Sequence, residues 1–348
     1  MFKRLAGLLL ALMLVATACG DDEGGGGGLL QTITDRGNVI CGVNDAVPGF
    51  GFTDETGQFS GFDVEYCRAV AAAVFGDASK VEFVPLTAAQ RFTSLQSGEI
   101  DVLIRNTTAT ASRDGTEGAT FLTTTFYDGQ GMMVRTGEFT SIDDMANTTI
   151  CVLTGTTTEL NLTARFAGIP FTASTFESND PLREAFVSGQ CDGWTSDKSQ
   201  LAGVKSGVEE AGVPLTILDE TFSKEPLGPV VADGDSQWAQ VVNWTVFATI
   251  QAEEWGITKA NVATLATGNE AIAAAIASGE LGGPNATVEN IAKFLGIGET
   301  DPGLGLSTDF VVDVISAVGN YGEIYEANVG VNTPLGLARA ANELWFKG

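Results

Sequence analysis

An apolar run gives way to a polar one in the stretch DVLIRNTTATASRD, which covers residues 101–114. Residues 100–104 are mostly apolar, which predicts a short buried strand of a parallel sheet. The polar residues after it leave the strand at its carboxyl end, where ligands bind in open α/β sheets. A guanidinium there, that of Arg113, would suit a small carboxylate because its planar fork makes two parallel hydrogen bonds. Alternatively, Arg113 pairs with Asp114 or caps a helix at the surface.

The residues before this stretch alternate between strand and helix patterns. β-Branched residues predict strands at 39–43 and 81–85, and periodic apolar residues predict helices at 64–75 and 88–96. Asp63 is a suitable N-cap for the first of these helices. The resulting order is strand, helix, strand, helix, strand, which is typical of an α/β unit.

The same order recurs further along the chain. The patterns predict strands at 149–153, 170–172 and before Asp197, and helices at 155–166 and 181–187. This predicts an α/β fold with two lobes, each a mainly parallel sheet flanked by helices. The segments 126–131 and 226–229 are rich in Gly or Pro between apolar runs, so we expect them to be two crossings that form a hinge.

The lobes and the remaining chain divide as follows. We expect residues 31–128 to begin lobe 1, residues 129–228 to form lobe 2 with hinge segments at its ends, and residues 229–348 to return to lobe 1. The returning part should be helical at 237–255, 261–265, 270–277, 288–295, 309–318 and 334–345. We interpret its tryptophans as packing residues: Trp238, Trp244, Trp255 and Trp345.

The first 30 residues resemble an export leader and a tether. A basic start precedes the apolar residues 5–16, which are too few to span a bilayer that needs ~20 residues. The small residues before Cys19 resemble a lipobox, which predicts a signal peptide at 1–18 and a lipidated Cys19; ordinary signal cleavage is the alternative. Residues 19–30 contain five consecutive glycines and read as a flexible linker.

Four further cysteines should form disulfides outside the cytoplasm: Cys41, Cys67, Cys151 and Cys191. Four cysteines allow three connectivities, and the sequence alone does not choose among them. We prefer Cys41 with Cys67 and Cys151 with Cys191, because each pair then lies in one half of the chain and leaves the halves free to move.

Charge and composition exclude several classes of partner and chemistry. The formal net charge of −26 would repel nucleic acids and anionic membranes, although a solvated acidic surface also explains it. The chain has no histidine, which removes Ser-His-Asp and Cys-His nucleophiles and His-ligated metals. The four widely spaced cysteines lack a CxxC motif, so we expect no metal site. We also expect no cofactor.

Two further signals in the second lobe complement Arg113. Thr156 and Thr157 lie at a predicted helix start, where free N–H groups and the helix dipole favour an anion, and a capping box of Thr156 with Glu159 is equally available. Asp197 ends its strand and would accept hydrogen bonds from an ammonium group, or would cap the following helix. Together these groups predict complementary ends for a zwitterion.

Long motifs carry a resemblance to the general L-amino-acid-binding proteins of polar amino acid ABC transporters: residues 61–77, 105–108, 112–114, 127–131, 155–162, 223–229 and 319–325. The resemblance covers nearly everything after about Leu30. It implies a type II periplasmic-binding-protein fold whose lobes close on a ligand. It also implies that Arg113 and Thr157 contact the carboxylate of an L-amino acid and that Asp197 contacts its ammonium.

The resemblance adds the other site residues. Thr108 stands beside Arg113, Thr156 beside Thr157, and Asn106 lies in the same polar loop. Asn44 stands where some relatives carry an aspartate on the first loop.

The resemblance implies a receptor that delivers L-amino acids, with broad or polar preference, to a membrane permease and its ATPase, and we expect it to be a monomer. It implies no catalysis. The net charge argues against a nucleic acid partner, and the predicted lipid on Cys19, which departs from the soluble periplasmic members, predicts contact with the membrane only through that lipid. One alternative is an enzyme such as a cyclohexadienyl or arogenate dehydratase, which needs a general acid such as Asp45. Another is a sensory domain, which would need a transmembrane or signalling segment.

Overall fold

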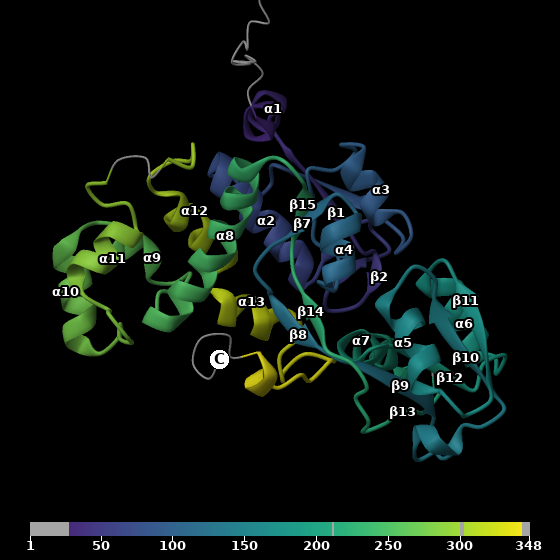
Figure 1. Cartoon of the computed structure of the whole chain (residues 1–348). Coiled ribbons are helices and arrows are strands. Elements are labelled where there is room, and N and C mark those ends of the chain that lie inside the picture. The colour runs from purple at the N-terminus through teal and green to yellow at the C-terminus, as the bar shows by residue number, and fades with distance from the viewer. Residues whose placement is uncertain (1–27, 211, 300–302, 343–348) are drawn as a thin grey trace, which may run out of the picture.

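The computed structural model describes residues 28–210, 212–299 and 303–342. Two α/β lobes are linked by a pair of strands, and further helices lie on the side of lobe 1 away from lobe 2 (Figure 1). The predicted two-lobed α/β plan is confirmed. The predicted signal peptide, Cys19 and the glycine run as far as residue 27 lie outside the described residues, as does Trp345.

The described sheet of lobe 1 has the strand order β5–β1–β6–β15–β7. Its strands are β5 (Val81–Pro85), β1 (Val39–Val43), β6 (Val102–Leu103), β15 (Val230–Ala232) and β7 (Ala119–Phe121). β1 is parallel to β5 and β6, whereas β15 is antiparallel to β6 and β7. Because β15 comes from the returning chain, lobe 1 is built from two separated segments. A small antiparallel sheet of β2 (Ala46–Val47), β3 (Gly51–Thr53) and β4 (Phe59–Ser60) also belongs to this lobe.

The helices that follow β4 in lobe 1 are α2 (Phe62–Phe75), α3 (Arg91–Gln96) and α4 (Ala111–Thr116). α2 is buried around most of its circumference because it lies between the sheet and the later helices α8 (Ser236–Trp255) and α12 (Phe310–Val318). A helix buried all round needs small residues for close approach, and the alanines at 69 and 71–73 supply them.

Lobe 2 repeats the plan of lobe 1. Its described sheet has the order β11–β10–β12–β9–β13, with β10 parallel to β11 and β12. These strands are β9 (Gln130–Arg135), β10 (Thr148–Leu153), β11 (Phe171–Phe176), β12 (Gly193–Asp197) and β13 (Leu215–Ile217). Its helices are η1 (Ile142–Asp144), α5 (Thr157–Arg165), α6 (Asn179–Val187) and α7 (Lys198–Glu210). β1 lies between β5 and β6 in lobe 1, and β10 lies between β11 and β12 in lobe 2, so the predicted repeat is confirmed.

The hinge is the antiparallel pair β8 (Phe126–Asp128) and β14 (Glu225–Leu227). Both predicted crossing segments lie there, between the lobes (Figure 1). The last part of the described chain also contacts the hinge: the Asn342 side chain accepts from Tyr127 N–H at 2.6 Å, and the Tyr321 hydroxyl donates to Thr125 O at 2.8 Å. Tyr321 and Asn342 therefore pack beside β8.

Helices before and after the lobes complete the described chain. They are α1 (Leu29–Arg36), α9 (Val262–Leu265), α10 (Asn269–Ser278), α11 (Val288–Phe294), α13 (Tyr321–Asn328) and η2 (Arg339–Ala341), together with α8 and α12. Within the described ranges, no helix combines the length and the apolar character needed to cross a bilayer. Trp238 and Trp255 are packing residues as predicted, but Trp244 is 52% exposed, so the packing prediction is wrong there.

The predicted helix at 334–345 is wrong over its described part. Residues 334–338 are not helical, and only η2 follows them. Gly336 has a φ of 62°, which interrupts a right-handed helix. Arg339 is held by Glu253, with Nη1 and Nη2 donating to the carboxylate at 2.7 and 3.0 Å, and its guanidinium lies against the rings of Tyr321 and Tyr325.

Two predicted elements of lobe 1 are shorter than expected. The strand predicted at 100–104 is only β6, because the carboxylate of Asp101 takes the place of a backbone partner by accepting from Ile40 N–H at 2.6 Å. The helix predicted at 88–96 begins at Arg91, since the side chain of Gln90 accepts from Thr87 N–H at 3.1 Å and turns the chain before the helix.

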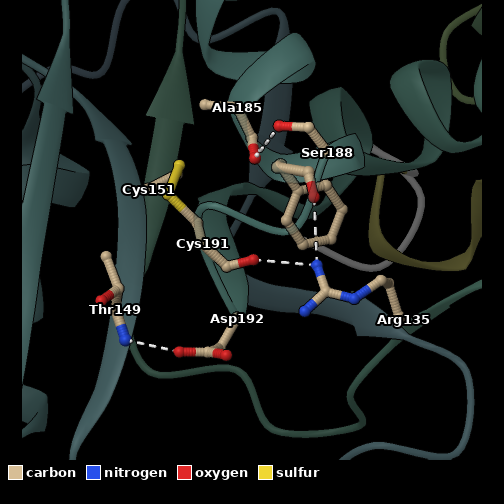
Figure 2. The surroundings of a disulfide bond; sticks show 8 residues. Arg135, Thr149, Cys151, Ala185, Ser188, Cys191 and Asp192 are labelled. Atoms are coloured by element: carbon tan, nitrogen blue, oxygen red, sulfur yellow. Dashed lines mark hydrogen bonds between the residues drawn. A yellow bond between two sulfur atoms is a disulfide. The ribbon is translucent and has the colours of Figure 1, made fainter.

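Both preferred disulfides are present, Cys41–Cys67 and Cys151–Cys191. Each lies within one lobe. Figure 2 shows the second bridge, where Arg135 Nη1 donates to Cys191 O at 2.8 Å and Thr149 N–H donates to the Asp192 carboxylate at 2.7 Å. The sulfurs are buried and the backbone around them is hydrogen bonded, so the bridge joins β10 firmly to the segment that enters β12.

Candidate functional site

A narrow cleft separates the lobes at the carboxyl ends of β6, β10 and β12. Five of its lining residues come from lobe 1: Arg91, Arg105, Asn106, Thr108 and Arg113. Thr156, Thr157 and Thr158, at the start of α5, line it from lobe 2. Ser196, Asp197 and Gln200 line it from lobe 2. The free volume is about 20 Å³, which is little more than one water molecule occupies. The lobes are therefore closed on each other.

Arg113 lies in α4, not in a loop as its polar neighbours predicted. Thr110 caps this short helix by accepting from Arg113 N–H at 3.2 Å. The guanidinium donates to Thr108 O at 2.9 Å and to Gly155 O, across the cleft, at 3.4 Å. The Asp114 carboxylate is not paired with this guanidinium and instead accepts from Phe121 N–H at 3.1 Å. Burial lowers the pKa of Arg113, and the charges of Glu225 and Asp197 oppose that shift.

Asn106 connects the two sides of the cleft. Its backbone has a positive φ of 30°, and its N–H donates to the Asp63 carboxylate at 2.6 Å. Its side-chain amide donates to Gln200 of lobe 2 at 3.2 Å and accepts from Asn44 at 3.2 Å. Asn44 therefore lies behind Asn106 and does not itself line the cleft.

Asp63 was expected to cap α2, and this is wrong. The helix begins at Phe62 after Gly61, and the Asp63 carboxylate turns to the loop that carries Asn106. Burial raises the pKa of Asp63 to about 7, against the opposing effects of Asn106 N–H and Arg105. Asp63 thus fixes the polar loop after β6, a role that its position in the sequence does not reveal.

The start of α5 faces the cleft as predicted. Thr156 is the N-cap and accepts from Glu159 N–H at 3.1 Å. The Glu159 carboxylate accepts from Gly155 N–H at 2.9 Å, one residue before the position of a standard capping box. Thr157, the first helical residue, donates its hydroxyl to Glu225 at 2.7 Å, and its Oγ1 lies 3.4 Å from Thr108 Oγ1.

Asp197 ends β12 with its side chain buried. Its Oδ1 has no hydrogen-bond partner among the described residues. Burial raises its pKa well above the ordinary range, and the charges of Asp128 and Glu225 raise it further. Asp197 does not serve as the cap of α7, because Asp128 from the hinge accepts from Ser199 N–H at 3.3 Å.

Sequence reasoning missed two buried arginines and a glutamate. Arg91 is 3% exposed and donates to Gly155 O at 3.3 Å, but its Nε has no partner among the described residues. Burial lowers its pKa well below the ordinary range, and burial lowers that of Arg105 to about 10. Arg105 directly follows the strand predicted at 100–104, so its position at the carboxyl end of that strand could have identified it as a cleft residue. Nothing in the local sequence pattern distinguishes Arg91 or Glu225 from surface residues.

No group of His, Cys, Asp or Glu in the described chain is arranged to hold a metal ion. The cleft instead offers three guanidinium groups and helix N–H groups for anions, and carboxylates for a cation. It brings six of the seven predicted ligand-binding residues to its walls, with Asn44 behind them. Their contact with a ligand stays a prediction.

Two α/β lobes of like topology, a two-strand hinge and a polar cleft between the lobes define a type II periplasmic-binding-protein fold. Residues 39–283 match the model of the bacterial extracellular solute-binding proteins, family 3. The chain belongs to that family.

Individual relatives agree with this assignment. The chain is 44% identical over 326 residues to the general L-amino acid-binding periplasmic protein AapJ of Rhizobium johnstonii, covering 92% of this chain and 90% of AapJ. It is 43% identical over 323 residues to the glutamate/glutamine/aspartate/asparagine-binding protein BztA of Rhodobacter capsulatus, with 92% and 90% covered. A periplasmic binding protein from Brucella ovis, solved with glutathione bound, is 42% identical with a TM-score of 0.82 and covers 93% of this chain and 97% of its own.

Proposed function

We propose that this chain is an extracytoplasmic receptor that captures L-amino acids between its lobes and delivers them to the permease of an ABC transporter. One observation carries the proposal: the Arg113 guanidinium and the Asp197 carboxyl group line the same cleft from opposite lobes, and one oxygen of Asp197 has no partner within the described part of the chain. An L-amino acid would place its carboxylate at Arg113 and the start of α5, and its ammonium at Asp197. The names of AapJ and BztA support this ligand class.

The other arginines support a preference for polar side chains. Among the described residues, Arg91 has no carboxylate partner and its buried Nε–H is unused, and Arg105 lines the same cleft. A buried, unsatisfied donor is costly and gains most from a ligand that supplies an acceptor. We therefore expect acidic and amide amino acids to bind more tightly than aliphatic ones, in line with the four amino acids in the name of BztA.

Entry of a ligand requires the lobes to part. Hydrogen bonds join them directly across the cleft, from Arg91 and Arg113 to Gly155 O and from Asn106 to Gln200. The small volume between them would not hold an amino acid. The two-strand hinge provides the motion, so binding would exchange these lobe-to-lobe hydrogen bonds for bonds to the ligand.

The location follows from the leader and the family. The family is described as extracellular, and we propose that a signal peptide exports the chain and that lipidation of Cys19 tethers it through the glycine-rich linker. A monomer would then serve one permease. The relatives that match over about nine tenths of their length are named as binding proteins, which supports binding without catalysis over the dehydratase alternative.

Thermal-shift screening of the chain from Leu29 onward tests the proposal. The panel contains the twenty L-amino acids, several D-enantiomers, glutathione, sugars and polyamines. A ligand at about 100 times its Kd stabilises the folded state by about 2.7 kcal/mol, which raises the melting temperature. Shifts with polar L-amino acids are expected. A shift with a sugar or polyamine and with no amino acid would contradict the zwitterion site.

A further inference from the structure

In the hinge strand β8, neighbouring residues are bound to different lobes. Phe126 is 4% exposed, and its ring packs edge-on against that of Phe50 in lobe 1 with 5.0 Å between centroids. The carboxyl group of Asp128, by contrast, accepts from Ser199 N–H of lobe 2 at 3.3 Å. Bending of this strand between the lobes therefore falls on Tyr127, which lies between these two residues.

The other hinge strand, β14, changes lobe at the residue opposite Tyr127. Leu227 is 1% exposed in the core of lobe 1, whereas Glu225 accepts from the Thr157 hydroxyl of lobe 2 at 2.7 Å. Pro226 lies between them and pairs with Tyr127. Because the proline ring fixes φ near −65°, β14 is the stiffer of the two strands at this level. Tyr127 is thus the pivot of the hinge.

Asn342 holds the backbone of this pivot from outside the hinge. Its Oδ1 accepts from Tyr127 N–H at 2.6 Å, and its Nδ2 donates to Tyr127 O at 3.4 Å. These two groups belong to the planar peptide units on either side of the Tyr127 Cα, so a single amide restrains both φ and ψ of the pivot. Asn342 is only 3% exposed, so water does not readily take its place.

Asn342 is itself anchored to lobe 1 through residues 337–342, which we call the strap. The Tyr325 hydroxyl of α13 donates to a carbonyl of the strap at 3.0 Å. Arg339 donates to both carboxylate oxygens of Glu253 in α8, at 2.7 and 3.0 Å. In Figure 1 this yellow end of the described chain lies beside β8. The strap therefore ties two helices of lobe 1 to the pivot of the hinge.

We propose that Asn342 is a positioning residue that restrains the pivot, so that the strap sets how fast the lobes part and not how tightly a ligand is held. Among the described residues, the strap forms no hydrogen bond with the cleft lining. Its contribution is therefore the same whether the lobes are closed with a ligand or without one, and it cannot shift the balance between those two states. Both entry and release require opening, so the strap slows both.

Thiol labelling measures opening without any ligand. Ser196→Cys places a thiol in the cleft wall, where the free volume of about 20 Å³ excludes a fluorescent maleimide until the lobes part. The chain from Leu29 onward keeps every described helix and strand and lacks Cys19, and the other four cysteines are in disulfides. In this background Asn342→Ala should raise the labelling rate about fivefold or more, because two hydrogen bonds at the pivot are lost. An unchanged rate would overturn the proposal.

A matched control and a double-mutant cycle show whether the strap acts as a unit. Asn328→Ala removes an amide of α13 that donates to Ile324 O at 2.8 Å, and it should leave the labelling rate unaltered. A rise as large as that of Asn342→Ala would indicate general loosening and would overturn the proposal. Arg339→Ala should speed labelling and add little to Asn342→Ala, whereas independent, additive increases would contradict a common path through the strap.

Ligand exchange tests the second half of the proposal. In stopped-flow experiments with L-glutamate on the chain without the cleft thiol, Asn342→Ala should raise the association and dissociation rate constants by a similar factor. The Kd should then stay within about twofold of the parent value. A rise in the dissociation rate alone would mean that the strap stabilises the bound state selectively, which would overturn the proposal.

Failure of this inference is distinguishable from failure of the proposed function. The exchange experiment rests on the proposed function, but the labelling experiment does not. If the parent binds no amino acid, the proposed function has failed, and the labelling rates still decide the role of Asn342. Should circular dichroism show that Asn342→Ala does not fold, Arg339→Lys takes its place, because lysine keeps the charge but loses the paired hydrogen bonds to Glu253. Faster labelling of that variant would support the proposal, and parental labelling would refute it.

Discussion

The Arg113 guanidinium and the Asp197 carboxyl group lie on opposite walls of one cleft. Both are largely removed from water, which strengthens any ion pair that a ligand forms with them and penalises a charge left alone. The Arg113 guanidinium donates to the Thr108 carbonyl group, whereas one oxygen of Asp197 has no partner within the described chain.

Replacement of Arg113 tests the carboxylate end of the site. Arg113→Ala should weaken binding of the best amino acid by about 2–5 kcal/mol, because the ligand carboxylate would lose its charged partner in a desolvated cleft. Titration calorimetry measures the change. The control is Arg183→Ala, which removes a surface arginine paired with Asp180 and should leave the Kd unaltered. Full affinity in Arg113→Ala would place the carboxylate elsewhere.

Protonation of Asp197 tests the ammonium end. Burial raises the pKa of Asp197 well above its ordinary range, and an ammonium group favours the ionised form. Binding should therefore release protons, and affinity should rise with pH until Asp197 is ionised in the free protein. Calorimetry in buffers of different ionisation enthalpy measures the release, and Asp197→Asn should abolish it. Proton uptake by the parent would contradict the assignment.

Among the elements, α2 carries a charge that costs stability near neutral pH. Burial raises the pKa of Asp63 to about 7, whereas an unfolded aspartate titrates near 3.9. Between those values the folded state binds more protons than the unfolded state, so the free energy of unfolding falls as pH rises from about 4 to about 7. Asp63→Asn keeps an acceptor for Asn106 N–H and should make that fall shallower. Urea denaturation across this range measures it, and parallel curves for the two proteins would contradict the prediction.

The bridge between β10 and the start of β12 should stabilise lobe 2 without affecting its motion. Its cysteines are 40 residues apart, for which the chain-entropy model gives roughly 4 kcal/mol. The pair Cys151→Ser with Cys191→Ser should lower the free energy of unfolding by about that amount. The Kd, measured where the protein stays folded, should change little because the bridge lies within one lobe. A full loss of binding by folded protein would show that the bridge shapes the cleft.

Over the whole molecule, the closed cleft predicts that the lobes must separate for binding. A Cβ built on Gly155 lies 3.7 Å from Ala89 Cβ across the cleft, within the usual range for a disulfide. Ala89→Cys with Gly155→Cys should lock the lobes closed when oxidised and prevent uptake of an amino acid. Equilibrium dialysis with labelled ligand measures uptake before and after mild reduction.

Controls separate locking from strain in this experiment. Gly155 has a φ of 71°, so a cysteine there is strained even without a bridge. Gly155→Cys alone and Ala89→Cys alone should both bind, and mass spectrometry confirms the engineered bridge. Equal uptake by the oxidised and reduced double variant would show that a ligand enters without lobe separation.

Local patterns in the sequence were enough to predict much of the architecture. β1, β5 and β10 appear within a residue of the predicted ranges, and the strand–helix repeat predicted two lobes of like topology. These features depend on side-chain periodicity and on caps within a few residues, which a linear sequence displays directly. The same holds for the α5 start, where Thr156 and Glu159 are neighbours in the chain.

The electrostatics of the cleft were decided only by tertiary structure. Glu225 meets Thr157 across 68 residues of sequence, and Asn106 meets Gln200 across 94. Asp128, not the adjacent Asp197, caps α7, and this leaves Asp197 free to face the cleft. Such contacts depend on how distant elements pack, and the desolvation that shifts the pKa of each group exists only once they have packed.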